Sequence, residues 1–123
     1  MDEESEEKLL MNLGLVGEIQ QKIAELDTSL KSLRRTGAAY AEAERNYRVA
    51  LRQKALVLKD EGMAIGMITL TVYGVPEIAE LRFRRDTAEA VYKANQEAIN
   101  VIKLELRIIE EQLKREWGNV DTE

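Results

Sequence analysis

The chain contains no cysteine and no histidine among its 123 residues. It therefore lacks the thiolate and imidazole groups that serve as nucleophiles, general bases and soft metal ligands. Without cysteine there is also no disulfide framework of the kind that holds small secreted domains together. From these absences we expect a protein that is not an enzyme, with no metal site and no cofactor.

Long apolar runs and aromatic residues are scarce as well. No stretch approaches the roughly 20 consecutive apolar residues that a membrane-spanning helix needs, so we expect no membrane partner. The first seven residues carry five carboxylates, unlike the basic leader of a secreted protein, and a cytoplasmic location follows by elimination. Aromatic residues make up 5% of the chain and charged residues 33%, which suits long solvated helices better than a globular core.

Both halves of the chain carry a mostly apolar residue every three or four positions. We call each series a seam, because it would line one face of a helix. In the first half the series is Ile19, Ile23, Leu26, Leu30, Leu33, Gly37, Tyr40, Glu44, Tyr47, Leu51, Lys54 and Leu58. In the second half it is Ile78, Leu81, Arg85, Ala88, Tyr92, Asn95, Ile99, Ile102, Leu106, Ile109, Leu113 and Glu116. Alternating steps of three and four are typical of two helices packed lengthwise. The sequence predicts an all-α fold, a long antiparallel helical hairpin with coiled-coil-like packing.

Glycine and proline residues predict where these helices begin and end. We expect all of them to belong to a single domain. We expect a frayed acidic start (1–8), a long helix (9–61), a connector with a short helix or turn at the tip (62–75), a second long helix (76–117) and a tail (118–123). Gly62 suits the residue after a helix end, Pro76 suits the first turn of a helix, and Gly118 suits a stop.

Two segments leave alternatives open. A break at Thr36-Gly37 would convert the hairpin into a three-helix bundle, but the heptad phase continues through Gly37 and the alanines that follow favour helix. The connector Met63–Val75 is rich in β-branched residues, which favours a strand. It has no partner strand, however, and its apolar residues fit helical spacing. We therefore predict an unbroken first helix and a short helix in the connector.

The predicted register follows from a turn centred near residue 68. It places Gly37 opposite Ile99, and Tyr92 opposite Glu44, where a buried hydroxyl–carboxylate hydrogen bond would fix the pairing. The last helix then pairs with residues ~19–60, so the turns before residue 19 extend beyond the overlap toward another subunit. Because two helices bury little area, we expect a homo-oligomer.

Basic residues gather near the predicted turn, although the net charge is −5. The candidate ligand-binding residues, for a phosphate or a nucleotide, are Arg45, Tyr47, Arg48, Arg52, Arg82 and Arg85. Guanidinium groups with an aromatic ring are typical of sites that hold phosphates and nucleobases. The alternative is a solvated flank whose arginines pair with neighbouring carboxylates. Arg85 lies on the seam and therefore needs an acidic partner, a ligand or a route to solvent.

The segment from Ala41 to Trp117 also carries a set of short motifs. They are Tyr47-Arg48-x-Ala50-Leu51, Glu61-Gly62-Met63, Gly74 with Glu77 soon after, Arg82-x-x-Arg85-Asp86 and Leu106-Arg107-x-Ile109-Glu110. In these motifs the chain resembles a largely uncharacterised family of small helical proteins encoded by phages and prophages of Gram-positive bacteria. The resemblance implies a non-structural gene product that acts in the cytoplasm of the infected cell.

Together these features predict a non-enzymatic, oligomeric binding protein. In the phage setting that the resemblance implies, it would inhibit a host defence, either by occluding a host protein or by sequestering a nucleotide-type signal in a basic pocket between subunits. One alternative is a replication or recombination accessory protein that binds DNA through the same basic residues. Another is a structural coiled-coil adaptor. The ligand, the host target and the oligomer number stay open at this point.

Overall fold

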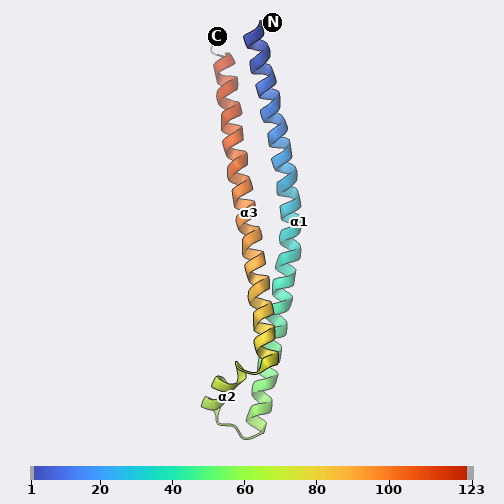
Figure 1. Ribbon diagram of the computed structural model, residues 1–123, viewed down its shortest axis with the longest axis vertical. Helices are drawn as coiled ribbons and strands as arrows, with labels where there is room; N and C mark the ends of the chain where they lie inside the picture. The colour runs from blue at the N-terminus through green and yellow to red at the C-terminus, as the bar shows by residue number, and fades with distance from the viewer. Residues whose placement is uncertain (1, 122–123) are drawn as a thin grey trace. The chain divides into compact units, whose positions relative to one another are not determined.

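The computed structural model describes residues 2–121, with side chains as far as Trp117. These residues form the helices α1 (Glu3–Asp60), α2 (Ile65–Val72) and α3 (Pro76–Asp121) (Figure 1). The all-α prediction is therefore confirmed for the described part of the chain. The helix α1 passes through Gly37 without a break, and the connector contains a short helix, both as predicted.

The chain divides into two compact units, each built from a stretch of α1 and a stretch of α3. Unit 1 comprises Met1–Ser32 and Gln96–Glu123, and unit 2 comprises Leu33–Asn95, which includes α2. Within each unit the two long helices run antiparallel (Figure 1). The predicted antiparallel pairing is thus confirmed within each unit.

The helix α1 begins at Glu3, earlier than predicted. The carboxylate of Asp2 accepts a hydrogen bond from the backbone N–H of Ser5 at 2.7 Å, which is the contact of an N-cap residue. Hydrogen bonds from Ser5 lower the pKa of Asp2, because they favour the charged carboxylate. The expectation of a frayed start is therefore wrong from residue 2 onward, and Met1 lies outside the described residues.

Gly62 ends α1 as predicted. Its φ is 91°, in the left-handed region that favours glycine. Its N–H donates to the carbonyl of Lys59 at 3.0 Å, and the N–H of Met63 donates to the carbonyl of Leu58 at 3.1 Å. These two bonds form a Schellman motif, which satisfies carbonyls that the end of the helix leaves without partners.

The helix α3 begins at Pro76 as predicted, with Glu77 in its first turn. The predicted stop at Gly118 is wrong, because α3 continues to Asp121. A glycine inside a helix costs only about 1 kcal/mol relative to alanine, and no proline follows to block the next turn. Residues 122–123 of the predicted tail lie outside the described residues.

Replacing Gly62 by alanine is expected to destabilise the protein by about 1–2 kcal/mol, because a Cβ is strained at positive φ. Gly14→Ala is the matched control, since a Cβ there meets nothing within 4 Å. We expect that control to stabilise the helix by up to about 1 kcal/mol. Urea unfolding monitored by circular dichroism measures both changes. A Gly62→Ala variant as stable as the parent protein would contradict the left-handed cap.

The core of unit 2 joins all three helices. Its buried residues are Tyr47, Leu58, Ile68, Val72 and Ile78. Ile68 and Val72 lie one turn apart on α2 and pack in the same cluster as Leu58, near the end of α1. The short helix α2 thus lies beside the last turns of α1, which α3 does not cover (Figure 1).

This position of α2 changes the register that the sequence predicted. A Cβ built on Gly37 would lie 3.2 Å from Cε1 of Tyr92, so Gly37 faces Tyr92. The predicted partner, Ile99, is seven residues farther along α3, which is one heptad. The prediction was wrong because it paired α3 with the end of α1, whereas α2 occupies that place.

The predicted hydrogen bond between Tyr92 and Glu44 is also wrong. The ring of Tyr92 lies instead against Tyr40, with centroids 6.0 Å apart. Near Tyr40, the carboxylate of Glu89 pairs with Lys93 at 2.6 Å. The hydrogen bond and charge of Lys93 lower the pKa of Glu89, whereas desolvation raises the pKa of Tyr40. At this level the two helices are therefore joined by the contact of two tyrosine rings, in place of the predicted hydroxyl–carboxylate hydrogen bond.

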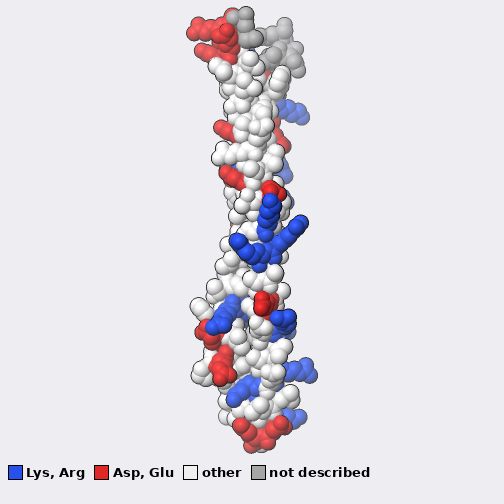
Figure 2. Space-filling view, turned by 90° about the vertical axis from the view of Figure 1, so that its right-hand side faces the viewer, with Lys and Arg blue, Asp and Glu red and all other residues white. Residues whose placement is uncertain are grey.

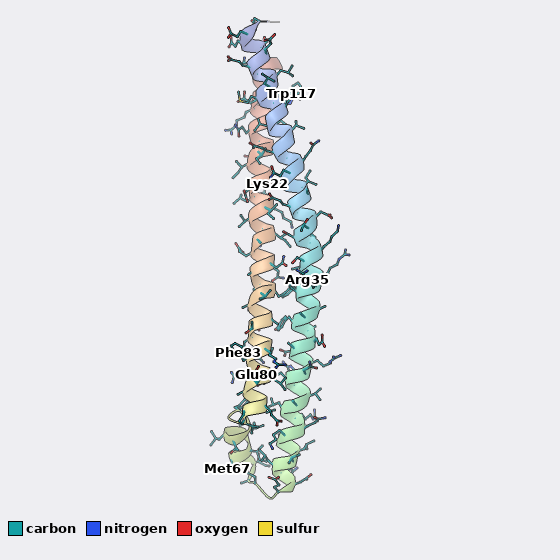
Figure 3. The ribbon with its side chains drawn as sticks, turned by 45° about the vertical axis from the view of Figure 1, so that its right-hand side comes forward. Lys22, Arg35, Met67, Glu80, Phe83 and Trp117 are labelled. Atoms are coloured by element: carbon teal, nitrogen blue, oxygen red, sulfur yellow. The ribbon has the colours of Figure 1, made fainter. Side chains whose placement is uncertain are left out.

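The first turns of α1 lie within the pairing of unit 1 rather than beyond it. Asn12 and Leu15 are buried, contrary to the expectation that residues before 19 extend past α3. Farther along α1, the ammonium of Lys22 lies 2.9 Å from Glu105 on α3 and 3.3 Å from Glu25 (Figure 3). Hydrogen bonds to these carboxylates raise the pKa of Lys22.

The prediction for the seam of α1 in unit 1 holds at Ile19 and Leu26, which are half-buried, but it is wrong by one position at Ile23 and Leu30. Lys22 and Ser29 are half-buried, whereas Ile23 and Leu30 are 51% and 43% exposed. Lysine tolerates such a place because its aliphatic stem packs while its ammonium reaches a partner. Large aliphatic side chains of α1 are consequently left on the surface of unit 1.

Candidate functional site

A pocket of about 460 Å³ lies in unit 2 and contains four of the six predicted site residues. Its lining residues are Tyr47, Arg48, Leu51, Tyr73, Arg82 and Arg85. Three of these belong to α1, one follows α2 and two belong to α3. The pocket therefore depends on the same three-helix arrangement that forms the core of unit 2.

Arg45 and Arg52 do not line this pocket, although the sequence grouped them with Arg48. Each residue of an α-helix is turned by about 100° from the one before it. Tyr47 is buried, and Arg48 follows it directly, whereas Arg45 and Arg52 lie farther around α1 and are exposed. Arg45, Arg48 and Arg52 lie on the same side of α1, because they are three and four residues apart. Only Arg48 is close enough to the buried face of the helix to line the pocket.

Arg85 is the most enclosed cation of the pocket. Its guanidinium carbon lies 4.5 Å from the centroid of the Tyr47 ring. One of its nitrogens lies 2.8 Å from Asp86, and another lies 3.7 Å from Glu44. The hydrogen bond to Asp86 raises the pKa of Arg85, against the opposing effect of burial. The seam arginine thus has the acidic partners that its position demands.

Glu44 lies between two arginines. Besides its contact with Arg85, it accepts a hydrogen bond from Arg48, one turn farther along α1. The side chain of Arg48 is 74% exposed, whereas that of Glu44 is 25% exposed. The alternative of arginines paired with neighbouring carboxylates is therefore correct for Arg48 and Arg85.

Arg82 differs from the other two arginines. Its guanidinium carbon lies 5.7 Å from the centroid of the Tyr73 ring. None of the ion pairs within 4.0 Å that join described residues involves Arg82. Sequence reasoning missed Tyr73 because only the packing of α2 on α1 brings it to Arg82.

The pocket has the chemistry of an anion site. Three guanidinium groups face two carboxylates, those of Glu44 and Asp86, so one positive charge is in excess. Two of the guanidinium groups lie near tyrosine rings, a contact that favours their place in the pocket, and the guanidinium fork matches the geometry of a phosphate. Among residues 2–121, no group of three or more acidic residues is placed to hold a metal ion.

A second exposed feature of unit 2 is the apolar surface of α2. Ile65, Met67 and Leu70 are 75%, 54% and 76% exposed, and Figure 3 labels Met67 on this helix. The helix has no acidic residue in its first turn and no basic residue in its last. Within the described part of the chain, no helix has the length and apolar character needed to cross a membrane.

Comparisons of the chain with protein-family models, with curated proteins and with solved structures give no match. No function is therefore transferred from a relative. The side chains of the pocket and the exposed apolar surfaces are the features of this chain that bear on its function.

Proposed function

We propose that the protein is a non-enzymatic binding protein that holds a phosphate-bearing, nucleotide-type small molecule in the pocket of unit 2. The observation that carries this proposal is the pocket itself, in which Arg48, Arg82 and Arg85 converge with two tyrosines. Guanidinium groups bind phosphate oxygens in pairs, and tyrosine faces stack on bases.

The energies of the contacts favour a phosphate over the existing carboxylate partners. The pair of Arg48 with Glu44 is largely exposed, and such pairs contribute only about 0–1 kcal/mol. Hydrogen bonds to charged groups contribute about 1.5–3 kcal/mol each. A phosphate that reaches Arg82 therefore gains a contact there without displacing a carboxylate, and at Arg48 it displaces only a weak, exposed pair.

The sequence resemblance implies that the protein acts in a phage-infected cell, and this setting indicates a role for ligand binding. In a cell infected by a phage, a protein that sequesters a nucleotide-type signal would inhibit the host defence that depends on that signal. Sequestration needs high affinity and many copies rather than turnover. A pocket of arginines and tyrosines meets that need without any catalytic group.

A second candidate function is the occlusion of a host protein. The exposed apolar side chains of α2, above all Ile65 and Leu70, favour it. Apolar surface of this kind marks sites of protein contact in many proteins. In this alternative α2 makes the contact, and the arginines serve only to hold unit 2 together.

Native mass spectrometry of the protein purified from a bacterium tests the proposal first. We expect a reproducible extra mass of a few hundred daltons that is lost when the same sample is denatured. The released compound should absorb as a nucleobase and contain phosphorus. A protein of bare mass that also fails to bind ATP and GTP would contradict the pocket and favour occlusion.

The salt dependence of binding separates this proposal from DNA binding. A small ligand held by two or three arginines should lose about tenfold or less in affinity between about 50 and 200 mM salt, because few charges are screened. A DNA strand held through six to ten phosphates would lose about 10³–10⁵ over the same range. Titrations with the released compound and with a 20-mer oligonucleotide measure both dependences. A steep loss for the oligonucleotide, with no binding of the compound, would support the DNA alternative.

A further inference from the structure

Unit 1 carries a regular line of exposed aliphatic side chains along α1. We call it the α1 stripe, and it consists of Leu9, Val16, Ile23 and Leu30. The members follow one another at intervals of seven residues, and each is between 38% and 51% exposed. The face of α1 that α3 covers is a neighbouring one, which includes Asn12, Leu15 and Lys22.

The seven-residue interval indicates what kind of partner fits the α1 stripe. A strict heptad repeat keeps one side of a helix in line with a second helix over many turns. At 1.5 Å per residue, the stripe from Leu9 to Leu30 extends for about 32 Å. Its partner is therefore another long helix with the same repeat, and α1 itself is such a helix.

We propose that the α1 stripe binds the α1 stripe of a second copy of this chain, in antiparallel orientation. The charges of α1 support this occupant. Its first turn carries Glu3, Glu4 and Glu6, and Figure 2 shows acidic side chains gathered at that end of unit 1. The opposite end of the stripe is followed in the sequence by Lys31, which pairs with Asp27 at 3.1 Å, and then by Arg34 and Arg35. An antiparallel pair brings acidic residues to basic ones, whereas a parallel pair brings like charges together.

The spacing of the stripe also fits a two-fold axis. With the axis between residues 19 and 20, Leu9 meets Leu30 of the second copy, and Val16 meets Ile23. The same patch then serves both copies, as a closed dimer requires. A strip about 32 Å long and about 10 Å wide is smaller than the roughly 800 Å² that each partner buries in a standard interface. We therefore expect a dimer that dissociates on dilution through the micromolar range.

Sedimentation velocity over a range of concentrations tests the proposal. Ile23→Glu places a charge in the centre of the stripe, and we expect it to raise the dimer dissociation constant by at least about tenfold. Val49→Glu is the matched control, because Val49 is on the same helix and is also 51% exposed, but lies in unit 2. The control should dimerise like the parent protein. A parent protein that is monomeric at every concentration, or equal effects of both variants, would overturn the proposal.

Single cysteines test the orientation, since the chain has none of its own. Gln20 is exposed next to the proposed axis, so Gln20→Cys should form a disulfide-linked dimer under mild oxidation. Glu6→Cys should not, because the two cysteines of an antiparallel pair would lie about 40 Å apart, beyond the reach of a disulfide. Links at both positions would mean a parallel pair, and a link at residue 6 alone would exclude the proposed axis. Circular dichroism checks that each variant keeps its helices.

Discussion

The double variant Arg48→Ala/Arg82→Ala is expected to bind the proposed nucleotide-type ligand at least about tenfold more weakly than the parent protein. Because both side chains are exposed, each contact contributes about 1 kcal/mol, and the two together exceed the roughly 1.4 kcal/mol that corresponds to a factor of ten. Neither side chain belongs to the buried core of unit 2, so the fold should persist. Isothermal titration with the compound released from the denatured protein measures the loss.

The matched control for this experiment is Arg45→Ala/Arg52→Ala. It removes the same charge from the same region of the chain, but neither residue lines the pocket. We expect its affinity to fall by less than about threefold, since screened charges at the surface act weakly. Equal losses in the two double variants would mean that diffuse positive charge, rather than the pocket, attracts the ligand. Full binding by Arg48→Ala/Arg82→Ala would contradict the site.

Replacing Ile78 by alanine is expected to destabilise the protein by about 2–5 kcal/mol. Ile78 is 2% exposed and belongs to the cluster that joins α1, α2 and α3 in unit 2. The lost methyl and methylene groups leave a cavity that the surrounding helices fill only in part. Because small domains are stable by only about 5–15 kcal/mol, the loss is a large fraction of the total. Urea unfolding followed by circular dichroism measures it.

Phe83→Ala provides the comparison for Ile78. Phe83 is a larger apolar residue on the same helix, but it is 65% exposed (Figure 3). Its truncation should change the free energy of unfolding by no more than about 0.5 kcal/mol. If Phe83→Ala were the more destabilising of the two variants, the assignment of the unit 2 core would be wrong.

The sequence predicted the helices of this protein because their signals are local. Heptad spacing predicted both long helices, Gly62 predicted the end of α1, and Pro76 predicted the start of α3. The register was predicted wrongly because its signal is not local. Placing Gly37 against Ile99 or against Tyr92 keeps the same seam on both helices, since the two choices differ by one heptad. Only the packing of α2 distinguishes them.

The candidate site was predictable to the extent that its members cluster in the sequence. Tyr47 and Arg48 are neighbours on α1, and Arg82 and Arg85 lie one turn apart on α3. The errors concern features that depend on three dimensions. The rotation of α1 turns Arg45 away from the pocket, and the fold of the connector brings in Tyr73.

The contact between Gly37 and Tyr92, together with the place of α2, has a consequence for folding. Two helices with the same heptad repeat can pair in two alignments that differ by seven residues. In either alignment the apolar faces of the two helices meet. In the alignment that places Gly37 opposite Ile99, α3 would cover the end of α1. The helix α2 would then lose the surface against which Ile68 and Val72 are buried. The burial of Ile68 and Val72 against α1 therefore stabilises the native alignment relative to the one shifted by a heptad.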